Sequence, residues 1–115
     1  MKTPHQKDKL LNGIKNIHMI GIGGSGMYPL AEILHAKGFS VTGSDVSEND
    51  LTARLASLGI KVYKGQRAEN TQGAQLIVYS AAVHEDNPER AAARERGIPQ
   101  MERSELLGAL TRHYD

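Results

Sequence analysis

The chain has 115 residues, a length that suits one domain with one hydrophobic core and leaves no room for a second independent domain. Its 14 lysines and arginines nearly balance its 13 aspartates and glutamates, and no basic block occurs, which excludes the usual charge pattern of a nucleic-acid binder. The absence of cysteine excludes disulfides, thiolate metal sites and a cysteine nucleophile. No apolar run approaches the ~20 residues that cross a bilayer, so we expect a cytoplasmic protein without a membrane partner.

The first part of the chain predicts strand and helix in alternation. Residues 1–15 are mostly polar and predict a flexible leader. Residues 16–22 are apolar and β-branched, as in a strand that is buried on both faces of a parallel sheet. Apolar residues at helical spacing then predict a helix within residues 27–38. Residues 39–45 predict a second strand, and Ser47 is expected to cap the helix that follows it.

The middle of the chain continues the alternation. Residues 60–65 predict a third strand, and residues 75–82 form the most strand-like segment after a polar loop. The next helix has a signal at both ends. Asn87 can accept from the first free amides, Pro88 has the fixed φ of a first helical residue, and Gly97 can end the helix.

The last part of the chain predicts a short fifth strand at residues 98–101 and an amphipathic helix at residues 103–114. Strands that alternate with helices form right-handed crossovers and a parallel sheet. We therefore expect an α/β fold, a Rossmann-like doubly wound parallel sheet of about five strands with helices on both faces. Ligands of such sheets bind beyond the carboxyl ends of the strands, where the strand order reverses.

A glycine-rich loop follows the first predicted strand. Gly21, Gly23 and Gly26 have the G-x-G-x-x-G spacing, and Gly24 occupies one of the intervening positions. The first glycine permits a tight turn, the second lets the backbone approach a phosphate, and the third lets helix and strand pack closely. The loop amides, the helix dipole and the Ser25 hydroxyl could hold an anion. The alternative is a purely structural turn between strand and helix.

Asp45 ends the second predicted strand, where dinucleotide sites place an acid on a ribose hydroxyl. Its alternative role is to cap a turn. On these grounds alone NAD would be the leading ligand, but the chain has no room for a substrate domain. His18 and His35 are expected to be structural, and only His84 falls on a loop at the ligand side. Neither an H-x-x-x-H pair nor a G-x-x-x-x-G-K-[ST] loop occurs, so the sequence supports no metal site, no ATP loop and no catalytic residue.

Five segments carry a more specific pattern, and they occur in order from Ile17 to the end of the chain. They read IHMIGIGGSGMYPLAEIL, VTGSD, GQRAEN, IVYSAAVHEDNPERAAARERGIP and ERSELLGAL. Together they resemble the amino-terminal domain of the Mur ligase family of peptidoglycan synthesis, and within it the ligases that add L-alanine to UDP-N-acetylmuramate. The resemblance places this domain at residues 16–115.

The resemblance implies a division of labour in a longer protein. Family members bind UDP-N-acetylmuramate on a Rossmann-like first domain, bind ATP and magnesium on a central domain, and close a third domain over both. ATP phosphorylates the muramoyl carboxylate, and the amine of L-alanine attacks the acyl phosphate. This chain alone would then bind the UDP-sugar without a cofactor of its own and form no amide bond, with the central and carboxyl-terminal domains as its partners.

The same resemblance assigns binding residues in three loops. The glycine loop would face the diphosphate, Asp45 would lie near the uridine, and the end of the fourth strand would give backbone amides and a hydroxyl to the nucleotide. The substrate-binding residues implied in this way are Gly21, Gly23, Gly24, Ser25, Gly26, Met27, Asp45, Gln66, Ser80, Ala81, Ala82 and His84. Asn87 lies in the same crevice, although helix capping accounts for it as well. No residue is assigned to a metal.

Two departures from the family pattern and several alternatives remain. Gln66 stands where many members have histidine, and Tyr28-Pro29 replaces smaller residues after the glycine loop. A sister ligase that recycles murein tripeptide is less similar in its first loop. An NAD(P)-binding module of an oxidoreductase and a nucleotide-sensing regulatory domain are the alternatives of other classes. If Gly23 faces the phosphate, its replacement by valine should abolish binding and leave the domain folded.

Overall fold

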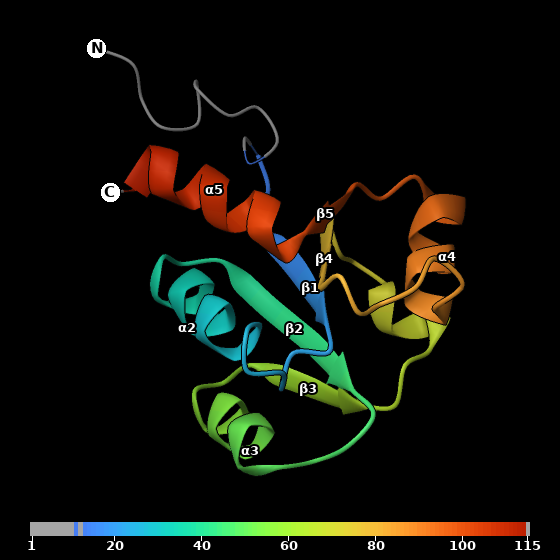
Figure 1. Cartoon of the computed structure of the whole chain (residues 1–115), viewed down its shortest axis with the longest axis horizontal. Coiled ribbons are helices and arrows are strands. Elements are labelled where there is room, and N and C mark those ends of the chain that lie inside the picture. The colour runs from blue at the N-terminus through green and yellow to red at the C-terminus, as the bar shows by residue number, and fades with distance from the viewer. Residues whose placement is uncertain (1–10, 12, 115) are drawn as a thin grey trace.

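The protein is a five-stranded parallel sheet with helices on both faces, as the sequence predicts (Figure 1). The computed structural model describes residue 11 and residues 13–114. The strands are β1 (Asn16–Ile20), β2 (Ser40–Asp45), β3 (Lys61–Lys64), β4 (Leu76–Tyr79) and β5 (Gln100–Glu102). The helices are α2 (Tyr28–Ala36), α3 (Asp50–Ser57), the 3-10 helix η1 (Ala68–Thr71), α4 (Pro88–Arg96) and α5 (Arg103–Tyr114).

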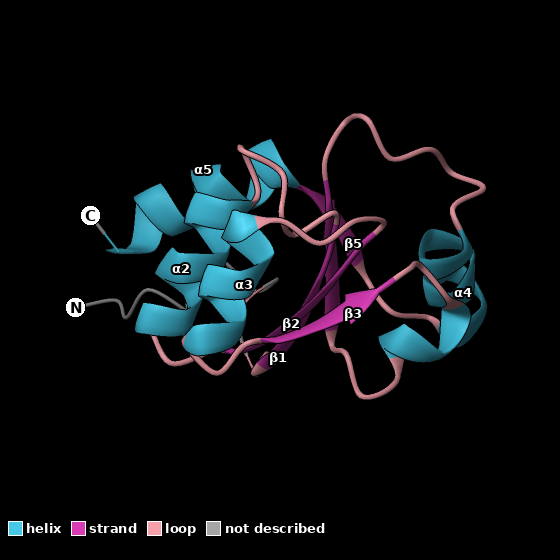
Figure 2. Ribbon diagram, turned by 90° about the horizontal axis from the view of Figure 1, so that it is seen from below, coloured by secondary structure: helices cyan, strands magenta, loops and turns pink. Residues whose placement is uncertain are grey.

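The strand order is β3-β2-β1-β4-β5, so β1 lies at the centre. Figure 2 shows α2, α3 and α5 on one face of the sheet and α4, with the short η1 beside it, on the other. The larger core lies under α2, α3 and α5, and a smaller cluster of Ile20, Ile77 and Ala93 lies under α4. The near-continuous apolar sequence of β1 is explained by this position, because residues 17–20 are buried on both faces.

The ends of several elements differ from the predicted ones. The first strand ends at Ile20 because Gly21, with φ of 74°, turns the chain at that point. The polar loop after β3 contains η1, which the sequence did not predict. The expected leader at residues 1–15 lies mostly outside the described residues, but Leu11 is buried in the larger core and Ile14 packs against it. These two residues are therefore part of the domain rather than a loose leader.

Helix α4 has both of its predicted ends. The Asn87 side chain accepts hydrogen bonds from the amides of Glu89 and Arg90, at 2.8 and 3.3 Å. Pro88 is the first helical residue, and Gly97 ends the helix in the left-handed conformation with φ of 70°. Within residues 11 and 13–114 no helix is both long enough and apolar enough to cross a membrane.

Helix α3 is capped by Asn49, and the prediction of Ser47 for this role is wrong. The Asn49 side chain accepts from the Thr52 amide at 3.0 Å, and the Thr52 hydroxyl accepts from the Asn49 amide at 2.9 Å. This reciprocal pair is a capping box, in which threonine takes the place of the usual acid or amide. Ser47 lies in the turn before it, where its own amide donates to Asp45.

We expect Asn49→Ala to lower the free energy of unfolding by about 1 kcal/mol, since the substitution leaves the first amides of α3 without their side-chain acceptor. Chemical denaturation followed by circular dichroism measures the change. Ser47→Ala is the matched control and should change stability by less than about 0.5 kcal/mol. Equal losses in the two variants would contradict the assignment of the cap to Asn49.

Candidate functional site

The strand order reverses beside β1, because β2 lies on one side of it and β4 on the other. The loops that follow β1 and β4 therefore run toward opposite faces of the sheet, the arrangement in which open α/β sheets bind ligands at the carboxyl edge, and we call the space between the two loops the crevice. These loops comprise residues 21–27 and residues 80–87. They contain most of the residues that the sequence assigned to ligand binding, so the topology brings the two predicted groups together.

The first half of the glycine loop is held against the end of β2. The amides of Gly21 and Ile22 both donate to the carbonyl of Ser44, at 2.8 and 3.0 Å. The amide of Gly23 donates to Oδ2 of Asp45 at 2.8 Å. The loop thus has a fixed position relative to the sheet before any ligand binds.

The second half of the loop offers unpaired donors. Ser25 and Gly26 are exposed, and neither forms a hydrogen bond with any part of the chain that the structure describes. Two successive free amides at the start of a helix form the kind of concave anion site that binds phosphate. The Met27 side chain, by contrast, is buried in the core, and its amide donates to the carbonyl of Gly24 at 3.0 Å. Met27 therefore presents neither its side chain nor its amide to the crevice.

Gly23 does not face the crevice, and the reason given for the Gly23→Val expectation is wrong. A Cβ atom at this position would lie 2.7 Å from Cγ2 of Thr52 and 2.9 Å from Oδ2 of Asp45. The side chain would therefore overlap Thr52 of helix α3 and the Asp45 carboxylate that accepts from the Gly23 amide, and it would not fill the space expected for a phosphate. Glycine is required here for close packing of the loop, and a valine would disturb the fold together with any binding.

The loop after β4 offers a second set of unpaired amides. Ala81 and Ala82 are exposed and make no hydrogen bond within the described ranges, while the amide of Val83 donates to the carbonyl of Ser80 at 3.0 Å. Two arginines of α4 donate hydrogen bonds to backbone carbonyls of this loop. Arg90 donates to the carbonyl of Val83 at 3.0 Å, and Arg94 donates to that of Glu85 at 2.8 Å.

The Asp45 carboxylate accepts hydrogen bonds both from the glycine loop and from the turn that follows β2. One carboxylate oxygen accepts from Gly23, and the other accepts from the amide of Ser47 at 3.3 Å. The turn-capping role considered from the sequence is therefore present. Each oxygen has a second lone pair, and the residue is only half-buried, so a ligand hydroxyl can still donate to it.

The side chains of Gln66 and Asn87 bond to each other beside the loop that follows β4. The Asn87 Nδ2 donates to Oε1 of Gln66 at 2.6 Å, while Oδ1 of Asn87 caps α4. Helix capping and this pair account for Asn87 fully. The Nε2 group of Gln66 has no partner among the residues that the structure describes, so it remains available as a donor. His84 is exposed at the rim.

A buried polar cluster behind the crevice was not predicted from the sequence. It consists of His18, Ser44, Asn70 and Glu89, which we call the Glu89 cluster. One Glu89 oxygen accepts from Nε2 of His18 at 2.8 Å and from the Ser44 hydroxyl at 2.7 Å. The other accepts from Nδ2 of Asn70 at 2.8 Å and from the Arg67 amide at 3.1 Å. His18 is structural, as the sequence predicts.

Glu89 is ionised in this setting. Burial opposes the charge and by itself raises the pKa, but hydrogen bonds from His18, Asn70 and Ser44 outweigh it and hold the pKa of Glu89 below its ordinary value. An ionised carboxylate only accepts, so Nε2 of His18 carries a proton. The cluster joins β1, β2, η1 and the start of α4, and the Arg67 amide adds the loop before η1. The site residues Asp45 and Gln66 belong to β2 and to this loop. The only signal in the sequence was the helix cap next to Glu89.

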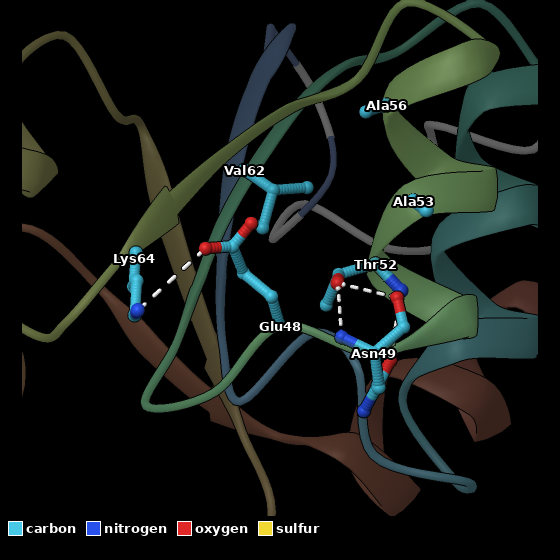
Figure 3. Close-up of a pocket in the computed structure, with 7 residues that line it drawn as sticks. All are labelled: Glu48, Asn49, Thr52, Ala53, Ala56, Val62 and Lys64. Carbon is cyan, nitrogen blue, oxygen red and sulfur yellow. Dashed lines mark hydrogen bonds and ion pairs between the residues drawn. The ribbon is translucent and has the colours of Figure 1, made fainter.

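A separate open pocket lies between α3 and the edge strand β3 (Figure 3). It has a volume of about 260 Å³ and is lined by Glu48, Asn49, Thr52, Ala53, Ala56, Val62 and Lys64. The Lys64 ammonium lies 3.7 Å from the Glu48 carboxylate, and the Asn49 and Thr52 groups bond to each other. Its polar groups are therefore already paired, and none of the residues assigned to ligand binding lines it. No group of three or more potential metal ligands occurs among the described residues.

The chain is similar in sequence and in fold to proteins of one family. Residues 16–115 match the model of the Mur ligase family, catalytic domain. The UDP-N-acetylmuramate--L-alanine ligase of Agathobacter rectalis is 57% identical over 101 residues, which are 87% of this chain and 22% of that protein. The crystal structure of the UDP-N-acetylmuramate-alanine ligase from Thermotoga maritima superposes with a TM-score of 0.81 at 36% identity, over 86% of this chain and 23% of that one.

A ligase that acts on a murein tripeptide is also similar to this chain. The UDP-N-acetylmuramate:L-alanyl-gamma-D-glutamyl-meso-diaminopimelate ligase from Neisseria meningitides has a TM-score of 0.76 at 32% identity, over 83% of this chain and 30% of that one. The chain thus spans about a fifth to a third of the length of the relatives that it matches. Since the family model covers nearly the whole described chain, the chain belongs to the Mur ligase family.

Proposed function

We propose that this chain is the UDP-N-acetylmuramate-binding part of a UDP-N-acetylmuramate:L-alanine ligase of peptidoglycan synthesis. The observation that carries the proposal is the pair of loops at the strand reversal, where the amides of Ser25 and Gly26 on one side and of Ala81 and Ala82 on the other have no partner among the described residues. Donors of this kind fit the oxygens of a diphosphate. The identity of 57% to an alanine-adding relative favours this substrate.

The remaining parts of the ligand have partners at the same edge. Asp45 would accept from a ribose hydroxyl, and the Nε2 group of Gln66, which has no partner among the described residues, would donate to a uracil carbonyl in place of the family's histidine. The glycine loop would provide the diphosphate contacts through Ser25 and Gly26, whereas the Gly24 amide already donates to the carbonyl of Gly21 at 3.0 Å, and Ser80 and His84 would lie beside the nucleotide. Gly21 and Gly23 bond the loop to the end of β2 through their amides, so we propose that they position the loop and do not contact the ligand.

The chemistry would belong to the longer protein. In that protein, ATP and magnesium would bind a central domain, a carboxyl-terminal domain would close over the site, and the amide bond would form in the cytoplasm. We propose that the 115-residue chain alone binds the UDP-sugar and catalyses nothing. Incubation with ATP, magnesium and L-alanine should therefore yield neither UDP-N-acetylmuramoyl-alanine nor phosphate above a blank.

A ligand panel followed by thermal melting tests the proposal. UDP-N-acetylmuramate or UDP at about one hundred times its Kd should add about 2.7 kcal/mol to the unfolding free energy and raise Tm by several degrees. NADH at the same concentration should change Tm little. No shift with either UDP ligand, in a sample that melts cooperatively, would overturn the proposal.

The alternatives predict different outcomes of the same panel. A larger shift with NADH than with UDP would favour a nicotinamide-binding module. A nucleotide-sensing regulatory domain should form a stable oligomer whose size or shape changes with nucleotide, which light scattering measures with and without ligand. A monomer in both states would exclude it.

A further inference from the structure

The Arg103 side chain lies against the glycine loop, although the two are far apart in the sequence. Arg103 is the first residue of α5 and follows β5 directly, so it lies at the carboxyl edge of the sheet with the loop. A methyl group built on Gly26 would lie 3.3 Å from Nε and 3.6 Å from Cζ of Arg103. The Arg103 side chain therefore lies beside Gly26, one of the two loop residues whose amides have no partner among the described residues.

The Arg103 guanidinium has no hydrogen bond and no ion pair within the described part of the chain, and its side chain is half-buried. The other arginines whose side chains are described each have a partner; they are Arg54, Arg67, Arg90, Arg94 and Arg96. The nearest acid in sequence, Glu102, uses its carboxylate to accept from the amide and hydroxyl of Ser104. These bonds chiefly lower the pKa of Glu102, and the Arg103 charge adds only a smaller attraction.

The position is unfavourable for a cation unless an anion is present. The first residue of a helix lies at the positive end of the helix dipole, where acids stabilise and arginine does not. A residue that breaks a local rule in this way is more often found at a functional site than elsewhere. Here the unfavourable charge also touches the predicted phosphate loop.

We propose that Arg103 binds the diphosphate of the ligand that the glycine loop holds. This inference rests on the proposed site and adds a side chain that no part of the sequence pattern assigned to it. The planar guanidinium can donate two parallel hydrogen bonds to phosphate oxygens, while the amides of Ser25 and Gly26 donate from the loop. The contact also supplies the positive charge that neutral amides lack.

Binding of UDP to the chain and to Arg103→Gln tests the role, with isothermal titration calorimetry as the measurement. We expect the substitution to weaken UDP binding about tenfold to a hundredfold, the effect of one charge-assisted pair. The melting temperature without ligand should stay equal or rise, because the substitution removes a cation from the start of α5. Arg103→Lys should retain part of the affinity, and the dependence of UDP binding on salt should become weaker in Arg103→Gln.

The control is Arg54→Gln, which removes an equal charge from an exposed side chain that pairs with Glu32 at 3.7 Å. It should leave UDP affinity within twofold. UDP affinity of Arg103→Gln within twofold of the unchanged chain would overturn the inference while leaving the proposed function intact. If the unchanged chain binds NADH and no UDP ligand, the proposed function fails, and the same variants measured with NADH, which also carries a diphosphate, decide the role of Arg103. Binding of neither class overturns both.

Discussion

Replacement of Glu89 by glutamine is expected to lower the free energy of unfolding by roughly 2–5 kcal/mol, because buried donors that now bond to the carboxylate would each lose an acceptor at about 1–3 kcal/mol. The glutamine keeps the shape of the side chain but presents an NH₂ group where an oxygen stood. That group would face either the donors of Asn70 and Arg67 or those of His18 and Ser44. The Asn70 and Arg67 donors would lose their acceptor in the first orientation, and the His18 donor would lose it in the second, where the Ser44 hydroxyl can turn and accept instead.

Urea denaturation followed by circular dichroism measures this loss. Glu95→Gln, at an exposed position of the same helix, is the control and should change stability by less than about 0.5 kcal/mol. A loss of less than 1 kcal/mol for Glu89→Gln would contradict the role assigned to the Glu89 cluster.

The same residue predicts how stability depends on pH. The folded pKa of Glu89 lies below the value of about 4.5 that applies in the unfolded chain, so its contribution is fully present above that pH. The contribution is lost as the pH falls from about 4.5 through the folded pKa. Stability measured across this range should fall more steeply for the unchanged chain than for Glu89→Gln.

Replacement of Gly43 by alanine should have the next largest effect, a loss of about 1–3 kcal/mol from overpacking. Gly43 lies in the middle of β2, and its Cβ would come 2.6 Å from Cβ and 2.8 Å from Cγ2 of Ile22. Ile22 is fully buried and belongs to the glycine loop. Its Cβ is fixed by the backbone, so a change of rotamer does not relieve the contact between the two Cβ atoms. The loop itself must move.

This movement gives Gly43→Ala a second expected result. Because Ile22 donates its amide to Ser44, displacement of Ile22 should also weaken UDP binding, although Gly43 contacts no ligand. Calorimetry with UDP measures the affinity, and Ser40→Ala, an exposed change in the same strand, is the control. Unchanged stability and affinity in Gly43→Ala would show that the loop tolerates the displacement.

The elements that the sequence predicted best have their signals close together in the chain. Helix α4 is the clearest example, because its cap, its first proline and its terminal glycine lie within the helix or beside it. Prediction failed at α3 for a related reason. Ser47 and Asn49 are both acceptable caps, and the choice of Asn49 depends on the turn that Asp45 forms with the glycine loop.

The residues of the candidate site also differ in whether a local sequence signal predicts them. The glycine spacing located the loop, because the spacing is a local requirement of a strand-to-helix turn. The direction in which Gly23 faces depends on where α3 packs, which the spacing does not contain. Arg103 had no signal in its own neighbourhood, and only the packing of α5 beside the loop brings the two together.

The sequence by itself determined the alternation of strands and helices, the parallel sheet and the loop that faces its carboxyl edge, since each depends on periodicity or on residues a few positions apart. The tertiary structure alone decided which polar groups are buried and which remain unpaired. Glu89 draws its partners from three separate segments, and Ser25, Ala81 and Arg103, whose donors have no partner among the described residues, follow three different strands at the same edge of the sheet. Hydrogen bonding between distant segments follows from packing, and packing is a property of the whole fold.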